Sequence, residues 1–390
     1  MKALRFDRKP TKFAAAALAG RLRAGAGAGV GPLALKDVDE PEPPTGDWVR
    51  LRPVLSGICG SDLATIDGRS SRYFEPIVSF PFTPGHEVVG LLDDDSRAVL
   101  IPVLSCTTRG IDPMCPACEA GRTNQCGRLA YGHLSPGLQT GYCKDTGGGW
   151  STSLVAHRSQ VLAVPDALTD EQAVMVEPTA CAVHAARTVA ADGDYASVAV
   201  LGAGTLGLLT VAALRAYATI GTLVATAKYP HQKTLAASLG ADRVCAPSEL
   251  SRLVRGLTGA FRLDDQNPAS GQLTDGVDLV VDCVGSAASL TQALEVVAPG
   301  GQVLVVGMPG HTSLDLTGLW QRETALRGCY AYTSDDFDAA LTLVADADLG
   351  RLVSATYSLA RYTQAIDHAA NAGARGAVKV AFDLRKKDRS

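Results

Sequence analysis

The sequence predicts an α/β protein of two domains, one rich in short β-strands and one built on a doubly wound parallel sheet. Its 390 residues exceed what one hydrophobic core usually supports. The first part, to about residue 165, is rich in glycine, proline and short apolar runs such as 49–55 and 87–92. The middle alternates apolar runs with alanine- and leucine-rich stretches, which is typical of βαβ units and a parallel sheet.

The expected elements of the middle follow one another closely. Apolar runs predict strands, and alanine- and leucine-rich stretches predict the helices between them. The strands are expected at 196–201, 222–227, 277–281 and 302–306, and the helices at 207–218, 231–239 and 287–297. A last strand is expected at 377–384.

The N-terminus predicts a strand at 1–6 and then an insertion. The apolar run 13–20 could suggest a signal peptide, but Arg21 and Arg23 interrupt it at once. A glycine- and alanine-rich stretch, 24–31, follows. We therefore expect a short helix and a flexible loop, inserted after the first strand.

The bulk composition excludes several classes of protein. Net charge is −4 and no basic run lies beside aromatic residues, which argues against nucleic acid as a partner. No window holds the roughly eighteen uninterrupted apolar residues that a membrane-spanning helix needs. The ten cysteines of so long a chain do not indicate a disulfide scaffold, and a tight cluster of them favours metal binding. We expect a cytoplasmic protein.

The segment "VAVLGAGTLGLL" predicts a dinucleotide-binding loop. Gly202 would allow the tight turn, Gly204 the approach of a pyrophosphate, and Gly207 the close packing of helix on strand. The amides of Thr205 and Leu206 would face the phosphates. A purely structural glycine turn is the competing interpretation, but an expected strand precedes the loop and an expected helix follows it.

The next strand end bears on which nicotinamide cofactor fits. An NAD(H) site uses a carboxylate there to hold the adenosine ribose. The stretch "LVATAKYPHQK" has none: the position falls on Ala227, followed by Lys228 and, further on, His231. A cation without a carboxylate favours the 2′-phosphate of NADP(H), although Lys228 could equally be a solvated surface lysine.

Two short segments of the first part carry residues that suit a catalytic metal. "SGICGSDL" contains Cys59, Ser61 and Asp62, and "PGHEVVG" contains His86 and Glu87. A thiolate, an imidazole and a carboxylate suit a catalytic zinc with an open position. Asp62 could orient the imidazole. Alone, the cysteine would be a small core residue and the histidine a loop residue, but their joint occurrence ahead of a dinucleotide loop favours the site.

A further carboxylate, Glu177, lies in "MVEPTACAVHA", where we expect it to precede a helix. With this segment the chain resembles the zinc-dependent medium-chain alcohol and polyol dehydrogenases. The shared motifs occur in the family's order: "GICGSD", "PGHEVVG", "GGGWSTSLV", "VEPTACAVHA", "VLGAGTLG", "VVDCVGS" and "APGGQVLVVG". Glu177-Pro178 is similar to the carboxylate motif of the sorbitol and threonine dehydrogenase branch.

The resemblance implies a GroES-like, mostly antiparallel β-barrel catalytic domain and an inserted Rossmann domain. The expected bounds are 1–176 for the first part of the catalytic domain, with a metal lobe at about 105–127. The Rossmann domain would cover 177–328, and residues 329–390 would return to the catalytic domain. The family pairs its Rossmann sheets through the stretch near Gly328–Tyr332, which implies a homodimer or homotetramer.

The resemblance also implies a role for each site residue. Cys59 and His86 would bind zinc, Glu87 would be a ligand that exchanges with water, and Glu177 a direct or water-mediated ligand. Ser61 would take the alcohol proton. Hydride would move between NADP(H), or NAD(H), and a secondary alcohol/ketone or aldehyde substrate.

One position departs from the family pattern. In C-G-S/T-D-x-H the last residue carries the proton relay to solvent, and here it is Ala64, which cannot. The relay must then end at ribose hydroxyls, at water or at another residue such as Asp67.

The segment "CTTRGIDPMCPACEAGRTNQC" resembles the family's structural zinc lobe. Cys115, Cys118 and Cys126 keep the last two spacings of C-x2-C-x2-C-x7-C. We favour Cys106 as the first ligand because four thiolates form the commoner closed site, while Asp112, at the regular offset, stays an alternative. A redox pair and a metal-free lobe are the other interpretations.

Two other functions compete with the zinc dehydrogenase. One is a zinc-independent NADPH-dependent reductase of activated C=C bonds, which would not need Cys59, His86 and Glu87 together. The other is a catalytically lapsed nucleotide-binding protein, which only Ala64 supports.

Overall fold

The structure is a computed structural model that describes residues 1–263 and 272–386. Its contacts divide the chain into two compact units. Unit 1 comprises residues 1–180 and 332–390, and unit 2 comprises residues 181–331. Helix α6, Val176–Asp192, begins in unit 1 and ends in unit 2.

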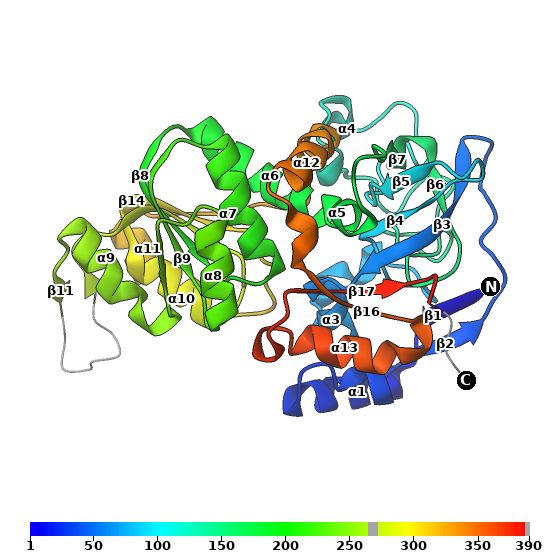
Figure 1. The fold of residues 1–390 in the computed structure, drawn as a ribbon, viewed down its shortest axis with the longest axis horizontal. Coiled ribbons are helices and arrows are strands. Elements are labelled where there is room, and N and C mark those ends of the chain that lie inside the picture. Colours follow the sequence, from blue (N-terminus) through cyan, green and yellow to red (C-terminus); the bar gives the residue numbers. More distant parts are fainter. Residues whose placement is uncertain (264–271, 387–390) are drawn as a thin grey trace. The chain divides into compact units, whose positions relative to one another are not determined.

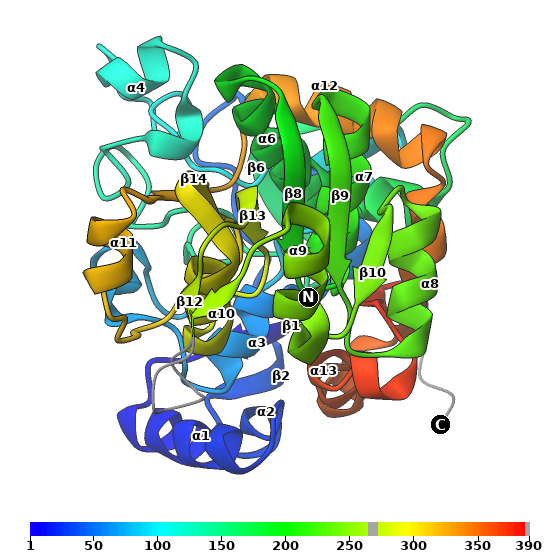
Figure 2. The same cartoon turned by 90° about the vertical axis from the view of Figure 1, so that its left-hand side faces the viewer.

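Unit 2 is built on a six-stranded parallel sheet in the order β10-β9-β8-β13-β14-β15. Figure 2 labels β14, β13, β8, β9 and β10 of this sheet, side by side in this order. Strand order reverses where β8 meets β13, which is the point where doubly wound sheets bind ligands. The strands are β8 Tyr195–Leu201, β9 Ile220–Thr226, β10 Arg243–Cys245, β13 Val277–Asp282, β14 Val297–Val305 and β15 Ala325–Gly328.

Helices connect these strands as the alternating sequence predicts. α7 packs on β8, β9 and α8, whereas α10 packs on β13, β14 and α9. The helices are α7 Thr205–Tyr217, α8 Pro230–Ser238, α9 Leu250–Thr258, α10 Ala287–Val296 and α11 Thr317–Gln321, and a two-stranded hairpin pairs β11 Arg262–Leu263 with β12 Gln272–Leu273. The expected helix at 207–218 begins earlier, at Thr205, because the glycine loop leads directly into it.

Unit 1 contains a seven-stranded sheet, ordered β16-β17-β3-β4-β5-β7, with β6 also pairing with β3. All of its pairs are antiparallel except β16 with β17. The strands are β3 Trp48–Gly57, β4 Val88–Leu91, β5 Arg97–Leu100, β6 Leu154–His157, β7 Val161–Ala163, β16 Val353–Tyr357 and β17 Lys379–Asp383. The C-terminal strand β17 therefore completes a sheet that the N-terminal half begins (Figure 1). The predicted two-domain α/β fold is confirmed.

The remaining elements of unit 1 are short helices and turns. The α-helices are α3 Gly60–Ile66, α4 Pro116–Glu119, α5 Asp170–Val174, α12 Ser334–Asp346 and α13 Tyr362–Ala370. The 3-10 turns of the chain are η1 Arg72–Ile77, η2 Thr123–Gln125, η3 Arg158–Gln160, η4 Pro247–Glu249, η5 Leu349–Leu352, η6 Leu359–Arg361 and η7 Gly373–Arg375. Among the described residues, no helix is long and apolar enough to cross a membrane.

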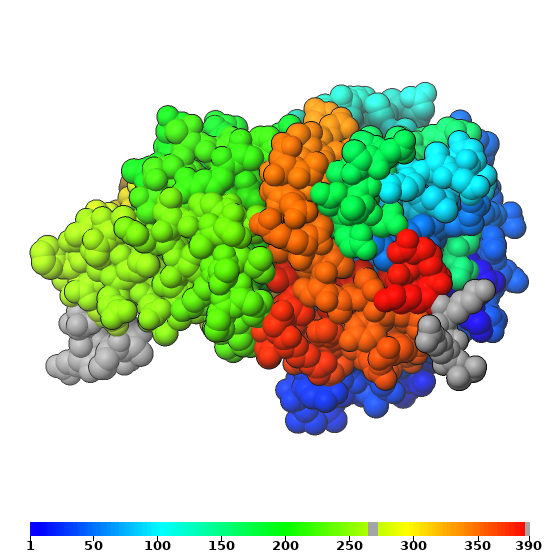
Figure 3. All heavy atoms as spheres, viewed as in Figure 1, coloured from blue at the N-terminus to red at the C-terminus, as the bar shows by residue number. Residues whose placement is uncertain are grey.

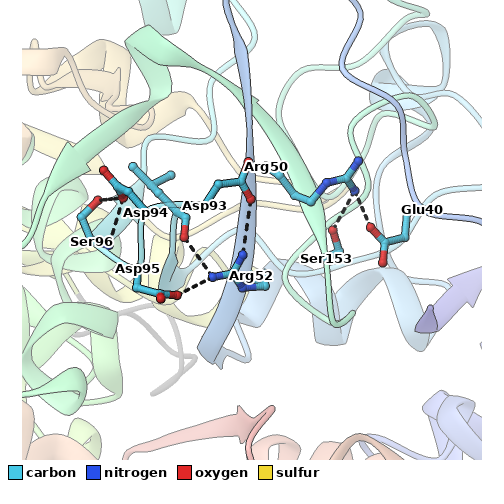
Figure 4. Close-up of polar contacts among 9 residues, drawn as sticks. Glu40, Arg50, Arg52, Asp93, Asp94, Asp95, Ser96 and Ser153 are labelled. Carbon is cyan, nitrogen blue, oxygen red and sulfur yellow. Dashed lines mark hydrogen bonds and ion pairs between the residues drawn. The ribbon is translucent and has the colours of Figure 1, made fainter.

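Two arginines on β3 fix neighbouring segments (Figure 4). Arg52 contacts Asp93 at 3.3 Å and Asp95 at 2.7 Å, both in the turn between β4 and β5. Arg50 contacts Glu40 at 2.6 Å in the segment that leads into β3. Exposed ion pairs of this kind contribute only about 0–1 kcal/mol each, so we assign them a local role in holding the turn.

The N-terminal insertion is more ordered than the sequence predicts. β1, Lys2–Phe6, pairs with β2, Leu33–Asp37, and α1, Pro10–Leu22, and α2, Gly27–Val30, lie between them. The expected flexible loop is therefore partly helical. Figures 1 and 3 show this segment beside the C-terminal α13, and α2 contacts α13.

Candidate functional site

The predicted ligands lie where three segments of unit 1 meet. β3 ends at Gly57, and Cys59 is the residue that caps the N-terminus of α3. The amide of Gly57 donates to the carbonyl of Glu87 at 2.8 Å, and the amide of Ile58 donates to that of Val380 at 3.0 Å. A Cβ at position 57 would come within 1.9 Å of a Glu87 carboxylate oxygen, so only glycine allows this approach.

The structure brings Cys59, His86 and Glu87 together. One ligand atom from each lies within 4.8 Å of the others. His86 and Glu87 are 3% and 1% exposed, and Cys59 is half-buried. A half-buried thiol, a buried imidazole and a buried carboxylate whose ligand atoms converge in this way fit a zinc ion chemically.

Asp62 lies beside this group without being part of it. Its Oδ2 accepts the Cys59 amide at 3.0 Å, and its Oδ1 lies 3.6 Å from Nδ1 of His86, beyond hydrogen-bond distance. Burial lowers the pKa of His86, but Asp62, Cys59 and Glu177 outweigh it and raise this pKa well above its usual value. Burial raises the pKa of Asp62, which is opposed by His86.

Lys379 on β17 is a site residue that the sequence reasoning missed. It is 2% exposed, forms an ion pair with the Glu87 carboxylate and donates to the Ile58 carbonyl at 3.3 Å. Burial lowers its pKa, but Glu87 and Cys59 raise it further, so the ammonium stays charged. A lysine inside the apolar run of a predicted strand, "GAVKVAF", was the available signal.

Glu177 lies outside the 4.8 Å group, in the first turn of α6 rather than before a helix as expected. Its Oε1 accepts the hydroxyl of Tyr332 at 2.8 Å. Burial, aided by the Glu87 charge, raises the pKa of Glu177 to about 7 although His86 opposes it. Tyr332 is 1% exposed and lies outside β15, the exposed edge strand of unit 2, which ends at Gly328.

Ser61 lies in the first turn of α3, half-buried and two residues from Cys59. The proposed onward route through Asp67 is wrong. Asp67 is fully buried, and its two carboxylate oxygens accept the amides of Gly25 at 2.8 Å and Gly27 at 3.1 Å. It is thus committed to anchoring the N-terminal insertion.

The four cysteines of the lobe form a second group whose sulfur atoms all lie within 4.8 Å of one another. Cys106 lies 3.7 Å from Cys126, and its sulfur accepts the Cys115 amide at 3.4 Å. The structure places Cys106 beside the other three and leaves Asp112 exposed. Burial acts to raise the pKa of Cys115, but the Cys118 and Gly127 amides lower it to about 6, whereas burial raises that of Cys118. Such a set fits a closed zinc site.

Arg109, inside the "TTRGID" insertion, was not singled out from the sequence. It is fully buried and donates to five backbone carbonyls, those of Leu104, Tyr131, Leu134, Ser135 and Gly137. Burial lowers its pKa. The insertion therefore organises the loop that follows the lobe.

The glycine loop of unit 2 has the local geometry that the sequence predicts. Gly202 has a φ of +91° between β8 and α7, a conformation that favours glycine. A Cβ on Gly207 would lie 1.8 Å from the Gly202 carbonyl oxygen, and a Cβ on Gly204 would meet nothing within 4 Å. Thr205 and Leu206 are the first residues of α7, so their amides lie at the positive N-terminal end of the helix.

At the end of β9, Ala227 is buried and Lys228 is exposed. The Lys228 ammonium lies 5.5 Å from the centre of the Tyr229 ring, and the His231 ring stacks on Tyr229 at 6.0 Å. The Lys228 ammonium therefore follows the end of β9, where position 227 offers no carboxylate.

Comparisons with known proteins agree on the type of protein. Residues 45–166 match the family model of the alcohol dehydrogenase GroES-like domain, and residues 205–346 match that of zinc-binding dehydrogenase. Sorbitol dehydrogenase of Bacillus subtilis (strain 168) is 27% identical over 341 residues, covering 83% of this chain and 86% of that protein. L-idonate 5-dehydrogenase of Vitis vinifera is 26% identical over 350 residues, covering 86% and 88%.

Solved structures share the fold over nearly the whole length. Alcohol dehydrogenase TADH from Thermus sp. ATN1 superposes with a TM-score of 0.72 at 24% identity, covering 99% of this chain and 100% of that one. 2R,3R-butanediol dehydrogenase from Bacillus subtilis gives a TM-score of 0.69 at 21% identity, covering 98% and 99%. With the two family matches and the polyol dehydrogenase relatives, these findings identify the chain as a member of the zinc-dependent medium-chain alcohol and polyol dehydrogenases, oxidoreductases that act on alcohols.

Proposed function

We propose that this enzyme oxidises a secondary hydroxyl of a small polyol with NADP⁺, and reduces the matching ketone with NADPH. The observation that carries the proposal is the convergence of Cys59, His86 and Glu87 within 4.8 Å at the start of α3. The relatives named for sorbitol, L-idonate and D-xylulose support an open-chain substrate with several hydroxyls.

Cys59 and His86 would hold the catalytic zinc, with Glu87 and Glu177 as exchangeable or water-mediated partners. A bound zinc supplies Lewis acidity, which favours loss of the alcohol proton. Lys379 holds the Glu87 carboxylate by an ion pair, so it competes with the metal for that ligand. Ser61 would take the alcohol proton, and a bound nicotinamide would accept the carbinol hydrogen as hydride. The Cys106, Cys115, Cys118 and Cys126 set would hold a structural zinc.

The cofactor preference is proposed from unit 2 alone. Lys228 supplies a cation near the expected 2′-phosphate, and Ala227 supplies no carboxylate to repel it. We expect Lys228→Ala to weaken NADP⁺ binding about tenfold, or ~1.4 kcal/mol, and to leave NAD⁺ binding unchanged. Lys233→Ala, on α8, is the matched control. Equal losses for both cofactors would remove the preference for NADP(H).

The first experiment counts zinc in protein purified without chelator, by elemental analysis. About two zinc ions per chain are expected for wild type, about one for Cys59→Ala, and about two for the control Cys245→Ala, whose thiol lies in the core of unit 2. Sorbitol, xylitol and 2,3-butanediol are then assayed with NADP⁺ and NAD⁺. A zinc content near zero, together with NADPH-dependent reduction of activated C=C bonds, would replace this proposal by the zinc-independent reductase.

The edge of the unit 2 sheet supports a proposal about assembly. β15 is the terminal strand, and all four of its residues are exposed. An exposed edge strand offers unpaired amides and carbonyls. We expect β15 to pair with that of a second copy, giving a homodimer or homotetramer. Light scattering on wild type and on Leu326→Pro measures this, and an unchanged monomer in both would contradict it.

A further inference from the structure

Ala64 leaves the enzyme without the side chain that ends the family's proton relay, yet unit 1 contains a chain of hydroxyl groups that begins at the same point. α3 carries Ser61 and Thr65 four residues apart, which places them on one face of the helix. The Thr65 hydroxyl lies 2.8 Å from that of Ser70 and 3.2 Å from that of Tyr142. Ser70 is half-exposed, so the chain ends in contact with solvent.

Tyr142 occupies the centre of this network. It is 8% exposed, and its ring packs against Phe82 at 5.2 Å between centres, which fixes the position of the hydroxyl. Burial and the Asp62 carboxylate raise the pKa of Tyr142 well above its usual value, although hydrogen bonds from Thr65 and Ser61 act in the opposite direction. The phenol therefore stays neutral. Its hydroxyl lies 3.2 Å from that of Thr65, and the Ser61 hydroxyl is near enough to lower its pKa.

We propose that Ser61, Tyr142, Thr65 and Ser70 form a hydroxyl relay that carries the substrate's alcohol proton from the catalytic site to solvent. The inference rests on the proposed function, because a proton relay is needed only if the enzyme oxidises an alcohol. The hydroxyl relay supplies the proton route that Ala64 and Asp67 cannot.

The transfer balances without any change of charge along the chain. The alcohol O–H proton passes to Ser61 Oγ, and the Ser61 proton passes to the Tyr142 oxygen. The Tyr142 proton then passes to Thr65 Oγ1, that of Thr65 to Ser70 Oγ, and that of Ser70 to water. Each hydroxyl gains one proton and gives one away, while the hydride leaves separately to NADP⁺. In ketone reduction every step runs in reverse.

Each inner hydroxyl also has a second acceptor, which allows the chain to reset. Thr65 can donate either to Ser70 or to the Ser61 carbonyl at 2.9 Å. Tyr142 can donate either to Thr65 or to Asp62 Oδ1 at 3.4 Å. After a transfer, the hydroxyls therefore rotate back without passing through an unpaired buried state, which would be unfavourable.

The test compares wild type with Tyr142→Phe, which keeps the packed ring, and Thr65→Val, which keeps the shape of the side chain. Tyr357→Phe is the matched control, because its hydroxyl contacts His368 at 2.8 Å outside the network. We expect kcat for alcohol oxidation to fall about ten- to a hundredfold in the two relay variants, with KM unchanged. The solvent deuterium isotope effect should rise, and the loss should shrink at high pH, where hydroxide accepts the proton directly.

A second readout needs no turnover. In protein labelled with ¹³C at Cζ of tyrosine, the deuterium isotope shift reports how fast the Tyr142 hydroxyl exchanges with water. We expect this exchange to slow at least severalfold in Thr65→Val and Ser70→Ala, and to stay as in wild type in Tyr357→Phe. If these hydroxyls only pack together and pass no proton, the Tyr142 hydroxyl will exchange at the wild-type rate in the relay variants.

The outcomes separate the two proposals. If wild type transfers hydride and the relay variants keep its kcat, isotope effect and exchange rate, the relay is refuted and the proton leaves through the cofactor ribose or water. If zinc-loaded wild type oxidises none of the alcohols, the proposed function itself fails, and the catalytic relay fails with it. Loss of kcat with a raised isotope effect and slower exchange supports the relay.

Discussion

The two candidate metal groups of unit 1 differ in what surrounds them. The four lobe cysteines lie within 21 residues and contact mainly one another and nearby backbone amides. Cys59, His86 and Glu87 are instead surrounded by Asp62, Glu177 and Lys379, ionisable groups from α3, α6 and β17. The thiols of the first group are held by one another and by backbone amides, whereas the second group has charged side-chain partners. We therefore expect metal loss to unfold the lobe and to leave the catalytic group folded.

The largest effect is expected in the lobe, where it tests whether the four cysteines depend on metal more than the catalytic group does. Cys118→Ser should reduce the zinc content by one and expose the amides of residues 106–128 to exchange. Structural zinc typically contributes on the order of 10 kcal/mol, which a lobe of this size cannot replace. Hydrogen exchange by mass spectrometry measures the change, with Cys245→Ala as control. Unchanged protection of the lobe amides would show that the thiols do not depend on metal.

Removal of a buried partner should have the next largest effect. Lys379→Met leaves the Glu87 carboxylate buried without its ion pair, which is expected to lower the free energy of unfolding by about 3–5 kcal/mol. The double variant Lys379→Met/Glu87→Gln should recover part of this loss, because no unpaired charge remains. Urea unfolding of metal-depleted proteins measures both. A double variant no more stable than the single one would mean that Lys379 acts through packing alone.

The buried carboxylate of Glu177 predicts a dependence on pH. Its pKa rises from 4.5 to about 7 on folding, so the native state binds this proton more tightly than the unfolded state. The contribution is therefore fully present below pH 4.5 and is lost as pH rises through 7, by up to about 3 kcal/mol. The stability of metal-depleted wild type relative to Glu177→Gln should fall between pH 5 and 8. A difference that stays constant would contradict the raised pKa.

The smallest effect is expected at the anchor of the N-terminal insertion. In Asp67→Asn, an N–H₂ group replaces one of the two carboxylate oxygens that accept backbone amides. The loss should be about 1 kcal/mol for that hydrogen bond, with faster amide exchange at Gly25 or Gly27. Asp94→Asn, in the exposed turn after β4, is the control. A strong fall in activity as well would contradict this local effect, because it would mean that the insertion also supports the catalytic site.

The sequence predicted most of the fold because its patterns are local. The strands and helices that were expected in unit 2 begin and end within about five residues of their expected positions, since apolar runs and glycine turns determine them, whereas β10, α9 and α11 were not expected. The metal candidates were found because they lie in short motifs. Lys379, Tyr142 and Tyr332 were missed because each reaches the site from a distant segment, and only the pairing of β17 with β3 brings the first of them there. Asp67 was misjudged because its partners, Gly25 and Gly27, lie about forty residues away.

With Arg109, the lobe would hold two cations, the guanidinium and the zinc ion, and the two differ in whether they can be removed. Zinc would be exchangeable: acid or a chelator can take it from the four thiols. The guanidinium donates hydrogen bonds to five carbonyl oxygens, which a bound cation would also attract. Unlike such an ion, it is covalently attached to the chain and stays charged across the working pH range. Residues 129–137 should consequently keep their shape after the thiols have lost their metal. A demetallated, unfolded lobe would then adjoin a loop that has kept its shape, beside which the cysteines can reassemble when zinc returns.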